Sequence, residues 1–360
     1  MKFSINYNGS IPLRDRIVQE IMAELEIHGH KLTSLSDELN FIINLVTFDK
    51  PRPVFRKAMN EFVISLSEIP EGLDDQRSTC YRMLVRTLSN LFICIKQNGG
   101  VVPEIYCTTP ETGYYHFSYS PGKMYESMLP IINARMMITN RVAENLPGEY
   151  CNTEVIEKMK HFGGVLDALG VLPSPFPLTD LLSQDDIDHL YRLYKIKGLS
   201  YGNLSAREDI PCIGRNTFWM TARGVDKAHL KGPAEDILLV TGYDPSNGEV
   251  LVSVPAEHNP KMRVSVDAIE HTLIYQAFPE VGAILHVHAW MKDIPSTCQN
   301  FPCGTLELAE DVVALLKTTQ QPGRTVVGLK NHGLTITGPD LDDIFSRIDG
   351  KLLKEVPMIP

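Results

Sequence analysis

The sequence lacks the features that mark membrane, secreted and nucleic-acid-binding proteins. No apolar run approaches the roughly 20 residues that span a bilayer, and the opening MKFSINYNGSIPLRDR contains no hydrophobic core of a signal peptide. Basic residues are outnumbered by acidic ones, so the formal net charge is -10. These absences predict a cytoplasmic protein with no membrane segment, and they argue against a nucleic-acid surface.

Cysteine is scarce and irregularly spaced. The chain has seven cysteines, an odd number, and none of them forms a C-x-x-C pair. This pattern favours free thiols in a reducing compartment over a disulfide framework. The first half of the chain also lacks a G-x-G-x-x-G or Walker loop, so it offers no nucleotide-binding motif.

The length of 360 residues, with 43% hydrophobic and 22% charged residues, is sufficient for two soluble globular domains. The segment LPSPFPL at 172–178 contains three prolines, which disfavour both helix and central strand. We therefore place a linker there. The predicted domains are residues 1–175 and residues 176–360.

The first half predicts a mixed α/β domain of unknown role. Apolar residues at helical spacing predict a helix over 13–25. Runs rich in β-branched and aromatic residues predict strands at 40–48, 61–69 and 90–97. The next segments predict a hairpin over 104–120 and a helix over 124–145, closed by Pro147-Gly148.

Three histidines carry the most specific chemical signal. His286 and His288 stand two apart in the apolar run AILHVHAW, and a strand's period of two puts both imidazoles on one face. His332 follows a second apolar run and can supply a third ligand to a tetrahedral metal site. An isolated His-x-His is also typical of two half-exposed histidines on an edge strand. Spacing alone leaves both interpretations open.

Residues 180–345 resemble the class II aldolase/adducin family, because six segments occur in that family's order. They are YGNLSAR, WMTARGVD, AEDILLV with its Asn247-Gly248 turn, the helix from Asp267 to Tyr275 that leads to HVH, GTLELAEDVVALL and LKNHGLTITG. The resemblance implies an α/β/α domain with a central, mainly antiparallel sheet. The fold class is therefore α/β throughout, with the mixed α/β domain preceding the family domain.

The resemblance also implies roles for individual residues. His286, His288 and His332 match the ligands of a divalent metal, most commonly Zn²⁺. The family's acid/base position, four residues before the helix histidine, is usually glutamate, and Asp267 occupies it here. Asp is one methylene shorter, and Glu270 can substitute for it if the helix is rotated. The alternative is that Glu270 is an ordinary exposed glutamate.

Five further positions match small polar groups that bind the substrate's anion in the family. Serine and asparagine donors and a glycine amide form an anion cradle without net charge, and an arginine adds a fork suited to phosphate or carboxylate. The matching residues are Ser200, Asn203, Arg223, Gly224 and Ser265. The resemblance therefore implies a small anionic substrate.

Three functions are consistent with these residues. The first is metal-dependent cleavage or formation of a C–C bond in a small phosphorylated or carboxylated sugar-like compound. The second keeps the metal for epimerisation or dehydration of a sugar phosphate, and the third is a non-catalytic adducin-like scaffold. The family further implies a homo-oligomer, commonly a tetramer.

Overall fold

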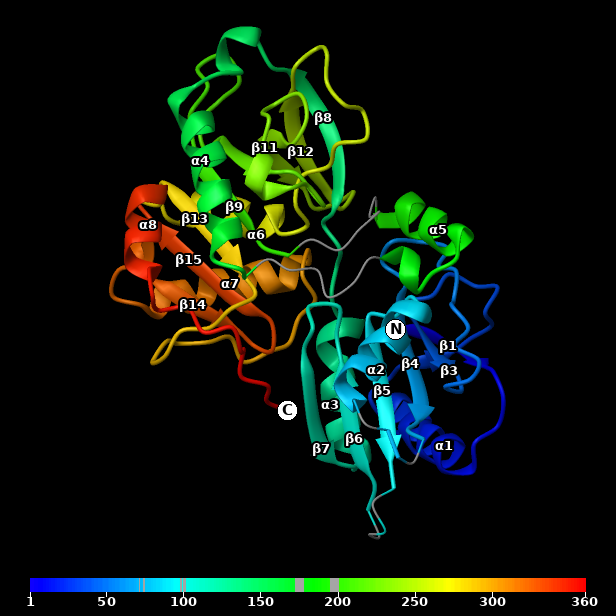
Figure 1. Ribbon diagram of the computed structural model, residues 1–360. Coiled ribbons are helices and arrows are strands. Elements are labelled where there is room, and N and C mark those ends of the chain that lie inside the picture. The colour runs from blue at the N-terminus through cyan, green and yellow to red at the C-terminus, as the bar shows by residue number, and fades with distance from the viewer. Residues whose placement is uncertain (71, 74, 98, 100–101, 172–177, 195–200) are drawn as a thin grey trace. The chain divides into compact units, whose positions relative to one another are not determined.

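The computed structural model describes residues 1–360 except 71, 74, 98, 100–101, 172–177 and 195–200 (Figure 1). The chain forms two compact units. The first contains Met1–Ala134, Leu178–Leu193 and Met358–Pro360, and the second contains Arg135–Pro177 and Tyr194–Pro357. Among the helices that the structure describes, none combines the length and the apolar composition that a bilayer crossing requires.

The division between the units differs from the predicted boundary near residue 175. Strand β8 (Thr139–Asn145) pairs in parallel with β12 (Glu249–Val254), and helix α4 (Glu154–Ala168) packs on β9 (Asn203–Arg207), so both belong to the second unit. Pairing and packing with later strands, rather than the position of the prolines, therefore determine that the segment with β8 and α4 joins the second unit. Most of the proline-rich linker, at 172–177, lies outside the described residues.

The first unit is built on a seven-stranded sheet. In spatial order its strands are β2 (Lys31–Leu32), β1 (Lys2–Tyr7), β3 (Phe41–Leu45), β4 (Phe62–Glu68), β5 (Leu91–Lys96), β6 (Glu104–Thr108) and β7 (Tyr114–Ser118). The first five run parallel, while β6 and β7 form the predicted antiparallel hairpin. Every residue of β3 is buried, as expected for a central parallel strand covered on both faces.

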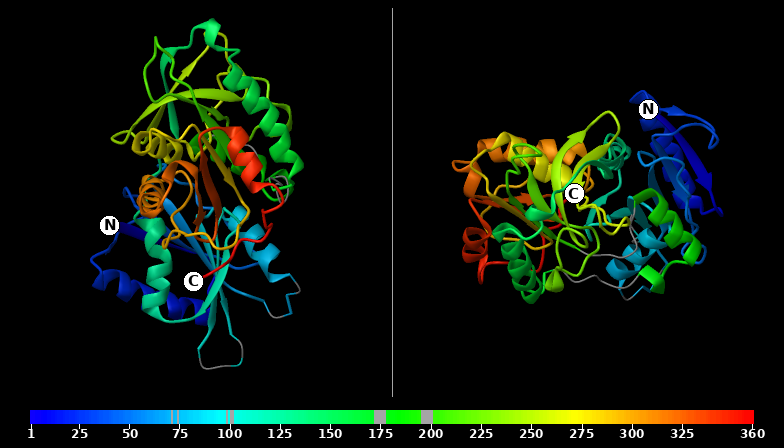
Figure 2. Two further views of the ribbon diagram at one scale, coloured as in Figure 1. Left: turned by 90° about the vertical axis from the view of Figure 1, so that its left-hand side faces the viewer. Right: turned by 90° about the horizontal axis from the view of Figure 1, so that it is seen from above.

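Helices cover both faces of this sheet. Helices α1 (Pro12–Ile27) and α3 (Pro121–Ile132) pack together on one face, and α2 (Gln76–Arg86) lies on the other (Figure 2, left). Helix α5 (Gln184–Tyr194) joins the same unit, where His189 Nε2 accepts a hydrogen bond from the backbone N–H of Arg56 at 3.2 Å.

The predicted helix over 124–145 is wrong in its second half. Helix α3 ends at Ile132, and β8 begins at Thr139. β8 is an edge strand whose backbone is paired along its length with β12, and most of its side chains are exposed. Hydrogen bonds to β12, a strand more than 100 residues later, therefore determine the conformation of residues 139–145. The local sequence pattern does not predict those hydrogen bonds.

The second unit contains an eight-stranded sheet, and its geometry confirms the predicted mainly antiparallel architecture. In spatial order its strands are β14 (Val326–Leu329), β15 (Gly333–Gly338), β13 (Ala283–Val287), β9, β10 (Phe218–Thr221), β11 (Ile237–Asp244), β12 and β8. All pairings except that of β12 with β8 are antiparallel among the described residues.

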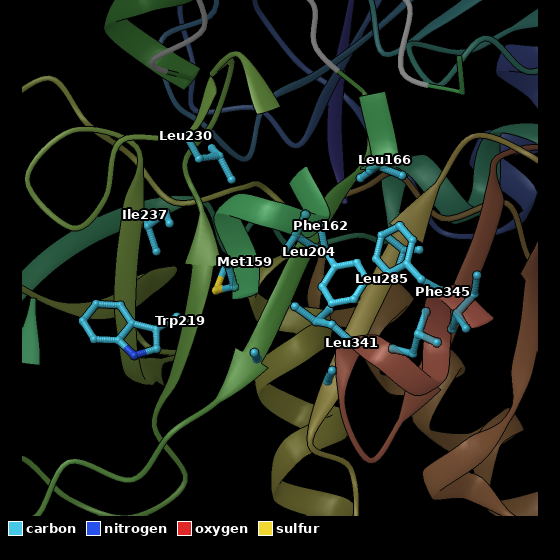
Figure 3. Close-up of a cluster of buried hydrophobic side chains, with 14 of the residues drawn as sticks. Met159, Phe162, Leu166, Leu204, Trp219, Leu230, Ile237, Leu285, Leu341 and Phe345 are labelled. Atoms are coloured by element: carbon cyan, nitrogen blue, oxygen red, sulfur yellow. The ribbon is translucent and has the colours of Figure 1, made fainter. Parts of the chain in front are cut away.

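Two pairs of helices cover this sheet. Helices α4 and α8 (Leu341–Ile348) lie on one face, and α6 (Ala268–Ala277) and α7 (Leu306–Thr318) lie on the other (Figure 2, left). Alternate residues of β13 follow this division, because Leu285 and Val287 belong to the cluster beneath α4 and α8, whereas Ile284 belongs to the cluster beneath α6 and α7. Figure 3 shows the first cluster, in which Phe162 stacks on Phe345.

Candidate metal centre

The two histidines of the His-x-His pair lie at the end of β13, a central strand. β13 is paired with β9 on one side and β15 on the other, so the edge-strand interpretation is excluded. His286 is directly opposite Asn203 on β9 and Thr335 on β15. These three side chains share the face covered by α6, because opposite residues in antiparallel strands point the same way. His288 follows one residue beyond the strand's end.

His332 reaches the same place from the hairpin between β14 and β15. Asn331 adopts the left-handed conformation there, with φ 57°. Gly333 follows His332 and lies against the end of β13, where an added Cβ would be 2.2 Å from the carbonyl oxygen of Val287. Only glycine permits this approach, and the approach brings His332 beside His286 and His288.

Replacing Gly333 with alanine is expected to destabilise the second unit. A Cβ at that distance from a backbone oxygen forces β13 and β15 apart, so we expect the free energy of unfolding to fall by about 2–3 kcal/mol. Urea denaturation followed by circular dichroism measures this change. Gly164→Ala in α4, where the added Cβ meets nothing closer than 3.8 Å, is the matched control. An unchanged midpoint for Gly333→Ala would contradict the argument.

The three imidazoles converge on one point. One nitrogen from each ring lies within 4.8 Å of the others, and the ring centroids are 4.8 to 5.3 Å apart in edge-on arrangements. A tetrahedral zinc ion with bonds of about 2.0–2.1 Å holds its nitrogen ligands roughly 3.4 Å apart. Small side-chain rotations therefore bring these rings onto one ion.

The electrostatic environment keeps the rings in the form that binds metals. Burial holds the pKa of His288 well below its ordinary value. Burial and the neighbouring His286 lower the pKa of His332 to about 3. Neutral imidazoles carry the lone pairs that a cation needs. Nδ1 of both His288 and His332 is buried, and neither atom has a hydrogen-bond partner among the residues that the structure describes. The donor set therefore fits a divalent metal such as zinc.

Asp267 lies at the start of α6 and is held by two of the predicted anion-binding residues. Its Oδ2 accepts hydrogen bonds from Asn203 Nδ2 at 2.7 Å and, more weakly, from Ser265 Oγ at 3.5 Å. Its Oδ1 is buried and has no hydrogen-bond partner in the part of the chain that the structure describes. The carboxylate also interacts electrostatically with His332. One oxygen of Asp267 is thus anchored, and the other remains available beside the three histidines.

Glu270 is buried rather than exposed. Its side chain is 2% exposed, and Oε1 accepts a hydrogen bond from Thr335 Oγ1 at 2.6 Å. Burial and then the charge of Asp267 raise the pKa of Glu270 to about 8, so the free protein carries it as the neutral acid at pH 7. The exposed-glutamate alternative is therefore wrong, and the sequence missed the contact with Thr335 because it joins positions 65 residues apart.

Two further polar residues of α6 face the sheet. His271 Nδ1 and the Tyr275 hydroxyl both lie 2.8 Å from Ser205 Oγ on β9. Nε2 of His271 is buried, and no described residue forms a hydrogen bond with it. Asp267, His271 and Tyr275 therefore lie along one helix face over β9, in agreement with their spacing of four residues.

Two cations flank Asp267. Arg223, in the loop after β10, donates from Nη2 to the carbonyl oxygen of Ile138 at 3.1 Å. Burial lowers its pKa to about 10, while the charges of Cys303 and Asp267 oppose that shift. Gly224 follows it with φ 69°. Predicted residue Ser200 lies outside the described residues.

Lys227 is the residue that sequence reasoning missed. It begins the short 3₁₀ helix η3 (Lys227–His229) and is 4% exposed. Burial lowers its pKa to about 8, and Asp267 is the largest influence opposing that shift. Its charge also lowers the pKa of His288. In the sequence it is an ordinary lysine three residues after Gly224, and only its burial distinguishes it.

The second unit matches a known family over part of its length. The model of the Class II Aldolase and Adducin N-terminal domain matches residues 187–292. The methylthioribulose-1-phosphate dehydratase of Sodalis glossinidius is 35% identical over 88 residues, which cover 24% of this chain and 35% of that protein. The Leptospira biflexa enzyme of the same name is 26% identical over 163 residues, 43% of this chain and 70% of that protein. The first match thus spans about a third of its relative.

Solved structures give a similar comparison. An L-fuculose 1-phosphate aldolase has 20% sequence identity and a TM-score of 0.35, over 56% of this chain and 84% of that one. An aldolase II superfamily protein from Pseudomonas syringae has 19% identity and a TM-score of 0.30, over 41% of this chain and 61% of that one.

Proposed function

The C-terminal half of the chain belongs to the class II aldolase/adducin family, and on that premise we propose that it is a metal-dependent lyase acting on a small phosphorylated sugar-like compound. The observation that carries the proposal is the meeting of three imidazoles, those of the buried His286 and His332 and the half-buried His288, from the end of β13 and the β14–β15 hairpin. Asp267, one oxygen of which has no hydrogen-bond partner among the described residues, interacts electrostatically with His332. A scaffold module has no evident use for this combination.

His286, His288 and His332 would hold the metal. A divalent ion bound there supplies Lewis-acid polarisation of carbonyl and hydroxyl oxygens. Three protein ligands leave a position for substrate, which is typical of catalytic rather than structural zinc. The buried setting strengthens every charge interaction within the site.

Asp267 would move the proton. Asn203 fixes Oδ2, so Oδ1 is the atom that accepts a proton from a substrate hydroxyl and returns it to carbon. Arg223, Gly224 and Ser265 would bind the substrate's anionic group, with Asn203 acting through Asp267 rather than on the anion. Ser200 keeps its proposed place in this group from the sequence alone.

Our first candidate reaction is cleavage or formation of a C–C bond. In the cleavage direction Asp267 takes the hydroxyl proton as the bond breaks, and a single proton-moving group suffices. The unpaired Oδ1 of Asp267, beside an Oδ2 that Asn203 holds, supports this candidate among the described residues.

Dehydration is the second candidate, and Lys227 favours it. Elimination of water needs a base for the proton on carbon and an acid for the departing hydroxide. Lys227 is a buried ammonium group that interacts with both Asp267 and His288, so it is placed to act as that acid. The relatives named methylthioribulose-1-phosphate dehydratase support the same reaction class.

Product analysis distinguishes the candidates. We expect the zinc-loaded protein, incubated with a panel of ketose and aldose phosphates, to give products that NMR can assign. C–C cleavage releases an aldehyde, dehydration retains the carbon skeleton with one water fewer, and epimerisation changes only stereochemistry. A protein that purifies without metal, gains no thermal stability from zinc and converts no sugar phosphate would contradict the lyase proposal and favour the scaffold. Homo-oligomeric assembly, implied by the family, belongs to the same proposal.

A further inference from the structure

We propose that Glu270 is a positioning residue whose carboxyl group accepts a hydrogen bond from the ring of His286 and so fixes the orientation of that metal ligand. This inference rests on the proposed metal centre and deepens it. It assigns Glu270 to the support of the site, whereas proton transfer stays with Asp267.

The sheet register places the two side chains together. His286 on β13 is directly opposite Thr335 on β15, and opposite residues in an antiparallel pair have Cβ atoms about 4.5–5.5 Å apart on one face. Thr335 Oγ1 donates to Glu270 Oε1 at 2.6 Å. The hydroxyl therefore holds the carboxyl group of α6 over the strand pair that carries His286.

The second oxygen of Glu270 needs a partner. Oε2 is buried and has no hydrogen-bond partner among the described residues. Burying a polar atom without a hydrogen-bond partner destabilises the fold, so such an atom usually has a function. An imidazole that binds a metal through one nitrogen has an N–H on the other, and that N–H typically donates to a carboxylate or carbonyl. Glu270 Oε2 supplies such an acceptor.

His271 is the competing partner for His286. The two rings interact electrostatically, and His271 Nε2 is also buried without a hydrogen-bond partner. Its other nitrogen is already engaged by Ser205 Oγ at 2.8 Å. Glu270 is neutral in the free protein, but a cation bound to the ring of His286 would favour the ionised carboxylate, and charge-assisted hydrogen bonds are about twice as strong as neutral ones. Acceptor strength in the metal-bound state therefore favours Glu270 over His271.

Zinc affinity tests this assignment without reference to catalysis. We would strip the full chain of metal and titrate zinc in competition with a chromophoric chelator. Relative to wild type, Glu270→Gln is expected to weaken zinc binding about 10-fold and Glu270→Met up to about 100-fold, the range found when such outer partners are removed. Glu257→Gln, on an exposed glutamate, is the matched control and should leave affinity unchanged.

A variant at another residue, Thr335, tests the inference even if the Glu270 variants fail to fold. Thr335→Val keeps the carboxyl group but removes the hydroxyl that holds it, and it should weaken zinc binding several-fold. If the wild type and the Glu270→Gln, Glu270→Met and Thr335→Val variants all bind zinc with the same affinity, this inference alone is overturned. Weaker binding in His271→Asn but not in Glu270→Gln would also overturn it. Absence of zinc binding by the wild type would overturn both this inference and the metal centre.

Discussion

Replacing His332 with asparagine is expected to abolish stoichiometric zinc binding. The substitution removes one of three imidazoles that converge within 4.8 Å. Zinc sites with four protein ligands bind with about 10–16 kcal/mol, so one ligand's share is about 3 kcal/mol, or roughly a hundredfold in affinity. Asparagine is polar and of similar reach, and it leaves the turn at Asn331 and Gly333 unchanged.

Two measurements report this loss. Elemental analysis should find about one zinc per chain in wild type and almost none in the variant. Zinc at about 100 times its Kd should stabilise the wild type by about 2.7 kcal/mol, a thermal shift that the variant should not show. His161→Asn, an exposed histidine on α4, is the control and should behave as wild type. Retention of one equivalent of zinc by His332→Asn would place the metal elsewhere.

The meeting of the three histidines was the part of the candidate site that the sequence could predict. A strand's period of two determines that His286 and His288 share a face, whatever the strand pairs with. His332 could be assigned to the same site only from the order of motifs. It reaches the other two histidines through the pairing of β13 with β15, and that pairing joins segments that are distant in the sequence. The fold class of the second unit followed from the same order of motifs and is confirmed.

The supporting residues could not be predicted in the same way. Glu270 and Lys227 are common surface residue types, and only tertiary packing buries them. The helix predicted over 124–145 failed for a related reason, since pairing with β12 gives 139–145 its strand conformation. Long-range contacts thus decided both the domain boundary and the charges around the metal centre.

Replacing Asp267 with asparagine is expected to lower kcat/KM by about 10²- to 10⁴-fold on the sugar phosphate that the wild type converts. General acid–base catalysis contributes about that factor, which corresponds to roughly 3–5 kcal/mol of activation free energy. The amide keeps an oxygen for the hydrogen bond from Asn203 but cannot accept a proton. Zinc content should remain near one per chain, because the ligands are the three histidines.

Two further variants separate proton transfer from simple disturbance of the site. Glu257→Gln, on an exposed glutamate outside the site, is the control and should change kcat/KM less than about threefold. Asp267→Glu keeps the carboxylate but moves it by one methylene, and a misplacement of about 1 Å costs up to a hundredfold. Activity of Asp267→Asn within tenfold of wild type, with zinc still bound, would exclude Asp267 as the acid/base. The buried ammonium group of Lys227 would then be the next group to test, because it interacts with both Asp267 and a metal-site histidine.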